Sequence, residues 1–136
     1  MSAPPNGLRD WLLQTFWWLP FGQVPEIPAR ELARRLATDP PQVLDVRTEM
    51  EWRRSRIDAA RSVPITELRR RLPALPLDPK RPVVAICLSA HRSIPAVRLL
   101  RARGYGDVVQ LAGGMLAWWR EGLPTVGTEP GAERGR

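Results

Sequence analysis

The chain of 136 residues contains one cysteine and one histidine, Cys87 and His91. A single cysteine excludes an intramolecular disulfide and cannot form the paired-cysteine motif of a structural metal site. With only one histidine beside it, the usual zinc clusters are excluded as well. We therefore expect no bound metal and no cofactor. An unpaired cysteine is typical of a reducing compartment, so we expect a cytoplasmic protein.

Lysine is nearly absent too, since Lys80 is the only lysine among 21 basic residues, and the net charge is +7. A strongly basic chain can bind nucleic acid or an anionic membrane. Here the arginines fall mostly on the polar sides of helical patterns, and no RNA-binding aromatic motif accompanies them. We expect solvated helix faces and no nucleic-acid binding. The positive surface would help to collect small anionic substrates.

No apolar run approaches the roughly 20 residues that cross a bilayer. The nearest candidate lies in residues 1–23, a tryptophan-rich segment with helical apolar spacing over residues 8–21. It lacks the basic start and small-residue cleavage site of a signal peptide. Two readings stay open: a helix that covers the core or a partner, or a peripheral membrane helix anchored by tryptophan. Residues 24–126 are expected to form one domain, and 127–136 a disordered tail.

Within the domain, short apolar runs alternate with helical patterns. Expected strands cover 42–46, 62–64, 82–86 and 108–111, and expected helices cover 28–36, 49–54, 66–72, 94–103 and 115–121. This alternation predicts an α/β domain, a small and mostly parallel sheet flanked by helices in three layers. Ligands bind such sheets beyond the carboxyl ends of the strands. Cys87 lies at that end of one strand, and Asp45 to Arg47 at that end of another.

The stretch CLSAHRS, residues 87–93, joins an apolar strand to an amphipathic helix. A loop in this position leaves backbone N–H groups unpaired around the cysteine sulfur, and the following helix adds its positive dipole end. Both favour the thiolate over the thiol. Arg92 adds a permanent charge, and Ser89 and His91 add side-chain donors. The pattern indicates a nucleophilic sulfur or a site that holds an anionic adduct.

Two chemistries fit such a loop: transfer of a sulfane sulfur, or attack on phosphate or arsenate. The spacing of Cys87 and Arg92 separates them, because four residues lie between the two, one fewer than in the loop of cysteine phosphatases. A shorter loop should be too tight for a tetrahedral oxyanion and still hold one persulfide sulfur. The spacing favours sulfur transfer and leaves a phosphatase or arsenate reductase as the weaker alternative.

Several ordered segments resemble the single-domain rhodanese family of sulfurtransferases. The similarity covers about residues 24–126. It lies in VLDVR (43–47), EW (51–52) and the turn up to Val63-Pro64, in the strand and loop of 83–93, and in the closing GY…V…LAGGM…W…GLP pattern of 104–124. The resemblance implies a rhodanese fold, no metal, and an activity that moves sulfur from thiosulfate or a persulfide to a thiophilic acceptor.

The resemblance also implies roles for individual residues. Cys87 would carry the persulfide, and a cradle for the substrate would come from Leu88, Ser89, Ala90, His91 and Arg92. Asp45, Arg47 and Ser93 would support the loop, with Arg47 paired to Glu51 or fixing the edge of the site. Each has a plainer alternative, since Asp45 and Arg47 could be turn residues and His91 a surface residue. Gly113, Gly114 and Trp118 are expected in turns and packing.

The chain departs from the family pattern at three places. Ala90 stands where a glycine is usual, so its methyl group would narrow the cradle or disfavour a positive φ. Ser55-Arg56-Ile57 replaces Gly-His-Ile, and the N-terminal segment has no counterpart. Expected partners are a small anionic sulfur donor, a thiol or cyanide-like acceptor, and a protein acceptor as a further candidate. A sulfur-carrier or interaction module tethered through residues 8–21 remains the alternative function.

Overall fold

The computed structural model describes Trp18 and residues 22–129 of the chain. Five parallel strands form one sheet in the order β1-β5-β4-β2-β3. They are β1 (Glu26–Ile27), β2 (Gln42–Asp45), β3 (Arg61–Ser62), β4 (Val83–Ile86) and β5 (Val108–Leu111). The predicted α/β fold with a small parallel sheet is confirmed.

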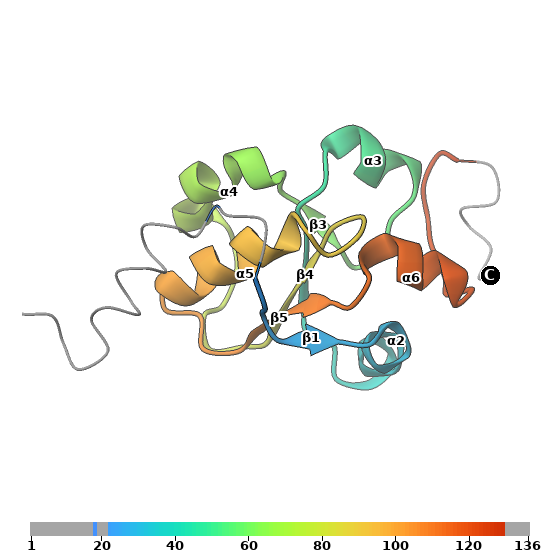
Figure 1. Ribbon diagram of the computed structural model, residues 1–136, viewed down its shortest axis with the longest axis horizontal. Helices are drawn as coiled ribbons and strands as arrows, with labels where there is room; N and C mark the ends of the chain where they lie inside the picture. Colours follow the sequence, from blue (N-terminus) through green and yellow to red (C-terminus); the bar gives the residue numbers. More distant parts are fainter. Residues whose placement is uncertain (1–17, 19–21, 130–136) are drawn as a thin grey trace, which may run out of the picture.

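Helices cover both faces of the sheet (Figure 1). Their bounds are α2 (Ala29–Thr38), α3 (Glu49–Arg54), α4 (Ile65–Arg71), the 3-10 turn η1 (Leu72–Ala74), α5 (Ser93–Ala102) and α6 (Gly114–Arg120). One apolar core lies between the sheet and α4 and α5, and a second lies between the sheet and α2 and α6. These are the three layers that the alternation of elements predicts.

The central strand β4 shows why its sequence is apolar throughout. Val83 and Ala85 enter the core beneath α4 and α5, while Val84 and Ile86 enter the core beneath α2 and α6. Successive strand residues point to opposite faces, so a strand covered on both faces must be apolar at every position. The carboxyl ends of β4 and β2 are joined where the Val46 N–H donates to the Ile86 carbonyl at 2.8 Å.

The predicted element bounds hold to within two residues for the helices. Strand β1 was not predicted. It is two residues long and is a strand only because it pairs with β5, with Glu26 opposite Gln110. At the other end, the Thr128 and Glu129 N–H groups donate to the carbonyls of Arg53 and Arg54. The hydrogen-bonded chain thus extends three residues past the predicted domain boundary at 126.

The expected amphipathic segment of residues 8–21 lies outside the described residues, apart from Trp18, and so does the tail at 130–136. Across the described ranges, no helix combines the length and apolar character needed to cross a membrane. The same residues contain no group of histidine, cysteine and carboxylate side chains placed to hold a metal ion.

Candidate active site

Cys87 follows β4 directly and begins the loop that leads into α5. Cys87 is 1% exposed, so its sulfur lies beneath the loop rather than on the surface. Residues 88–90 and Arg92 are half-buried, and His91 is exposed. A reactant can therefore approach only through the loop itself.

The loop has free backbone donors. Within the described chain, the N–H groups of residues 88–92 donate to no acceptor, although most backbone N–H groups in folded proteins are paired. A run of free N–H groups in a tight loop is the arrangement that binds anions. The structure thus leaves available the donors that the strand–loop–helix pattern predicts.

The first two carbonyls of the same loop are engaged by α6. The Met115 N–H donates to the Cys87 carbonyl at 2.8 Å, and the Leu116 N–H donates to the Leu88 carbonyl at 3.0 Å. Gly114 makes this approach feasible, because a Cβ there would lie 2.5 Å from the Cys87 carbonyl oxygen and 2.4 Å from that of Leu88. Gly114 therefore acts in loop packing as well as in the turn that its sequence suggests.

Ala90 adopts a positive φ of 65°, and it is the only non-glycine residue of the described chain that does so. This left-handed conformation costs an L-residue roughly 1–2 kcal/mol. The methyl group of Ala90 was expected to disfavour a positive φ, and the loop adopts that conformation in spite of its cost. Neighbouring contacts, above all the two hydrogen bonds from α6, impose the backbone path in spite of the methyl group.

Arg92 forms a bidentate ion pair with Glu51 of α3. Its Nη1 donates to Glu51 Oε1 at 2.6 Å and its Nη2 to Oε2 at 2.9 Å. This pairing is the main cause that lowers the pKa of Glu51 from 4.5 to about 2. The same hydrogen bonds raise the pKa of Arg92, with smaller contributions from the negative charges of Glu51, Cys87 and Asp45. Arg92 thus anchors the loop to α3 while its charge acts on the sulfur.

The predicted pairing of Arg47 with Glu51 is wrong. Arg47 instead forms a buried ion pair with Asp45, its Nη2 donating to Oδ2 at 2.8 Å, and a second bond from Nη2 reaches the Ser55 carbonyl at 2.7 Å. Both side chains are 1% exposed. Asp45 and Arg47 are two residues apart at the end of β2 and point to the same side, which brings them together. Asp45 acts through Arg47, whose guanidinium holds the end of α3 near the sheet.

Glu51 is directed toward the loop by the start of its own helix. It forms a capping box with Thr48, accepting from the Thr48 N–H at 3.2 Å, while the Thr48 hydroxyl accepts from the Glu51 N–H at 3.3 Å. The pattern Thr-Glu-Met-Glu at residues 48–51 is the sequence signature of this cap. Read as a cap, it would have shown that Glu51 is fixed at a helix start, but not that it meets Arg92.

Ser93 and His91 complete the polar contacts of the loop. The Cys87 sulfur lies 3.3 Å from the Ser93 hydroxyl oxygen, which in turn donates to Gln110 Oε1 at 2.6 Å. The Ser89 hydroxyl lies 2.9 Å from His91 Nδ1, so these two exposed-side residues hold each other. Ser93 is the one predicted support residue that directly contacts the sulfur.

Comparison with known proteins bears on this geometry. A model of the rhodanese-like domain family matches residues 28–121. The chain belongs to the rhodanese-like domain family. This confirms the family that the sequence motifs indicate.

Two curated relatives and one solved structure show how close the similarity is. The chain is 39% identical over 107 residues to a sulfurtransferase of Allochromatium vinosum, covering 78% of this chain and 98% of that protein. It is 34% identical over 115 residues to thiosulfate sulfurtransferase 18 of Arabidopsis thaliana, covering 74% and 84%. The crystal structure of a rhodanese-related protein from Thermoplasma volcanium matches with 31% identity and a TM-score of 0.68, covering 76% of this chain and 98% of that one. These similarities support a sulfurtransferase activity.

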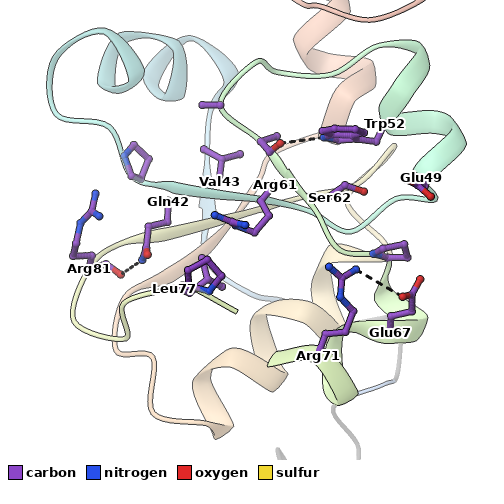
Figure 2. Close-up of a pocket in the computed structure, with 15 residues that line it drawn as sticks. Gln42, Val43, Glu49, Trp52, Arg61, Ser62, Glu67, Arg71, Leu77 and Arg81 are labelled. Atoms are coloured by element: carbon purple, nitrogen blue, oxygen red, sulfur yellow. Dashed lines mark hydrogen bonds and ion pairs between the residues drawn. The ribbon is translucent and has the colours of Figure 1, made fainter. Parts of the chain in front are cut away.

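The rhodanese-like domain also contains a cavity of about 720 Å³ away from Cys87. It lies beside the edge strand β3, and none of residues 87–93 lines it. Figure 2 shows its arginines, Arg61, Arg71 and Arg81, around Leu77, with the Trp52 indole at one end bonded to the Ala60 carbonyl. The cysteine and the free N–H donors lie at the other site, which is therefore the candidate for the chemistry.

Three contributors to the site were not predicted as such: Gly114, Glu51 as the partner of Arg92, and Gln110. Gln110 had a visible signal, because it is a polar residue in the otherwise apolar strand VVQL and is only 4% exposed. A buried amide must be hydrogen-bonded to remain buried. The contact of Gly114 with the loop is purely tertiary and had no local signal.

We predict that Gly114→Ala destabilises the protein by about 3 kcal/mol, at the upper end for single substitutions, because the new methyl group meets the carbonyls of Cys87 and Leu88. Gly104→Ala is the matched control, since Gly104 also has a positive φ, 94° against 59° at Gly114, and a Cβ at Gly104 meets nothing within 4 Å. Chemical denaturation of both variants measures the difference. Equal stability of the two variants would contradict the packing role of Gly114.

Ala90→Gly should leave stability unchanged or raise it by about 1 kcal/mol, because glycine adopts positive φ without strain but loses more chain entropy. Ala102→Gly, in the last turn of α5, should instead lower stability by about 0.5–1 kcal/mol. Thermal unfolding of the two variants tests whether their changes in stability have opposite signs. A loss at residue 90 as large as that at residue 102 would show that the loop is not strained.

The ion pair of Glu51 and Arg92 gives a prediction on pH. The folded-state pKa of Glu51 is lowered to about 2, so its contribution to stability is full above the ordinary value of 4.5 and is lost as the pH falls toward 2. The difference in the free energy of unfolding between wild type and Glu51→Gln should therefore decrease steadily from pH 5 to pH 2. Glu49→Gln, which breaks only an exposed pair with Arg53, should show little difference at any pH. A Glu51→Gln gap independent of pH would refute the assignment.

Proposed function

We propose that this rhodanese-like domain transfers a sulfane sulfur from an anionic donor to a thiophilic acceptor through a persulfide on Cys87. The observation that carries the proposal is the combination of Cys87 at the carboxyl end of β4 with the five free N–H groups of residues 88–92. Arg92 adds a fixed positive charge at the same place. Together they favour negative charge on the cysteine sulfur or on a sulfur bound to it.

In the first half of the cycle, the Cys87 thiolate attacks the outer sulfur of the donor. A bond from Sγ to that sulfur forms, and the bond between the two sulfurs of the donor breaks. Its electron pair leaves with sulfite when the donor is thiosulfate, or with the thiolate when it is a persulfide. With mercaptopyruvate, which has a single sulfur, the carbon–sulfur bond breaks instead and its electron pair stays on pyruvate as the enolate. The product is an anionic persulfide on Cys87. The free N–H groups of the loop supply donors for its outer sulfur.

In the second half, an acceptor thiolate or cyanide attacks the outer sulfur of the persulfide. The Sγ–S bond breaks and its electron pair returns to Cys87 as thiolate. Such a covalent intermediate divides the transfer into two displacement steps with one nucleophile. Cys87 is 1% exposed, so the outer sulfur, one bond farther out, is the atom that an acceptor reaches. A protein acceptor would have to present its thiol through the mouth of the loop.

Leu88, Ser89, Ala90, His91 and Arg92 form the proposed cradle, each with a different part. The backbone of residues 88–92 provides donors, and the Ser89 hydroxyl and His91 ring hold each other at the exposed rim. Arg92 is placed by Glu51, and Asp45 and Arg47 hold the adjoining end of α3. The single free cysteine is consistent with a cytoplasmic location, which forms part of the proposal.

We predict that the wild-type protein gains one sulfur atom after treatment with thiosulfate, glutathione persulfide or mercaptopyruvate and removal of excess donor. Intact-protein mass spectrometry measures the gain, and Cys87→Ser should show none. Comparing the three donors identifies the preferred class. If none of them adds sulfur to wild type while the thiol remains titratable, the proposed transfer is wrong.

A further inference from the structure

A continuous chain of hydrogen bonds links the Cys87 sulfur to the exposed edge of the sheet. From Cys87 it passes to the Ser93 hydroxyl at 3.3 Å, to Gln110 Oε1 at 2.6 Å, and from Gln110 Nε2 to Glu26 Oε2 at 2.9 Å. Cys87, Ser93 and Gln110 are buried, whereas Glu26 is exposed on β1. The register places Glu26 directly opposite Gln110, so the pairing of β1 with β5 builds the outer end of the chain.

The chemistry of Glu26 fixes the direction of every bond in this chain. An ionised carboxylate only accepts hydrogen bonds, so the amide nitrogen of Gln110 must face Glu26. The amide oxygen of Gln110 then faces Ser93 and can only accept, so the one hydroxyl proton of Ser93 is donated to Gln110. The Ser93 oxygen that remains toward Cys87 is an acceptor. Cys87 can satisfy it only as a thiol that donates its proton.

We propose that Gln110 and Glu26 are positioning residues that turn the Ser93 hydroxyl away from the sulfur and thereby lower the thiolate fraction of resting Cys87. This rests on the proposed role of Cys87 as the nucleophile. When Cys87 loses its proton, Ser93 either leaves the thiolate without its hydroxyl donor or gives up Gln110. One hydrogen bond is lost in both cases, and the chain opposes ionisation.

The persulfide meets a smaller penalty: it also lacks a proton for Ser93, but it places no full negative charge against the Ser93 oxygen. Its inner sulfur, Sγ, has no proton and little charge, and its negative charge lies on the outer sulfur toward the loop. The bond from Ser93 to Gln110 can stay intact. The chain therefore disfavours the empty thiolate more than the loaded form, which shifts the balance toward the loaded form.

Other ionisable groups act on the sulfur from the remaining sides. On the elements around the loop they are Asp45 and Arg47 at the end of β2, Glu51 on α3, and His91 and Arg92 in the loop. Arg92 and the loop N–H groups favour the thiolate, in opposition to Ser93. None of these groups contacts Gln110 or Glu26. Substitutions at those two residues therefore leave the effects of Arg92 and the loop N–H groups on the sulfur unchanged.

The test uses the rate of alkylation of the protein by iodoacetamide as a function of pH. Cys87 is the only cysteine, so the rate reports one sulfur. Gln110→Leu removes the competing acceptor, and Ser93 can then donate to the thiolate. One hydrogen bond to a charged group corresponds to a displacement of the pH–rate profile by about one unit to lower pH. At a pH below the midpoint, the reaction becomes about tenfold faster.

Gln42→Leu is the matched control for this variant. Gln42 lies on β2 and bonds to Asp78, far along the chain from Ser93, so its loss disturbs a strand amide without touching the sulfur. Its alkylation profile should coincide with that of wild type even if its melting temperature falls. A displacement equal to that of Gln110→Leu would mean that destabilisation alone moves the profile, and would overturn the proposal.

Glu26→Gln, on the exposed edge, is a second variant that leaves the core intact. With no carboxylate, the Gln110 amide can turn over, and the profile should move in the same direction by a smaller amount. Ser93→Ala separates the hydrogen-bond route from a direct effect of charge. In that background, neither Gln110→Leu nor Glu26→Gln should move the profile further. The same displacement with and without Ser93, or none from Gln110→Leu, would overturn the proposal.

Alkylation requires no sulfur donor, so its outcome is independent of the sulfur-transfer experiment. Displaced profiles without persulfide formation would support the positioning chain and reject the proposed function. Persulfide formation with unmoved profiles would do the reverse.

Discussion

The loop that begins at Cys87 is held by its carbonyl oxygens, not by its N–H groups. The first turn of α6 donates to the carbonyls of Cys87 and Leu88, and this is feasible because Gly114 has no side chain to obstruct the approach. Because α6 holds the loop through these two carbonyls, the N–H groups of residues 88–92 stay available. The position of α6 is fixed in turn by Met115 and Trp118, which are buried against the sheet. The position of the free donors in the loop thus depends on packing on the other side of the helix.

Two environments meet at the Cys87 sulfur. On the loop side, free N–H groups and the charge of Arg92 favour a negative sulfur. On the core side, the hydroxyl of Ser93 is already committed to Gln110 and offers only an acceptor. A site that favoured the anion on every side would hold the empty thiolate as strongly as the loaded persulfide. In the proposed cycle, this asymmetry would let the protein distinguish the two by where the charge lies.

The fold could be predicted well from the sequence, and the site only in part. The apolar strand Val83–Ile86 and the polar residues after β2 carry strong local patterns, so their place in the sheet could be inferred. β1 could not, because two residues show no periodicity and only β5 makes them a strand. In the site, the position of the cysteine and its loop could be predicted, because the loop lies between an apolar strand pattern and a helical pattern that are adjacent in the sequence. The partner of Arg92 and the contact of Gly114 depend on which elements meet in space. Glu51 and Gln110 did leave signals, a helix cap and a polar residue in a buried strand, whose destination the sequence does not name.

Glu51 serves two contacts of different range. Its contact with Thr48 spans three residues and belongs to the first turn of α3, while its pair with Arg92 spans 41 residues. The local contact restricts the rotamers of the carboxylate before the distant arginine arrives. Part of the side-chain entropy that a partly buried ion pair normally loses is therefore already lost when the helix forms. The long-range contact closes onto a preorganised group, and the anchor of the active-site loop is ready as soon as α3 exists.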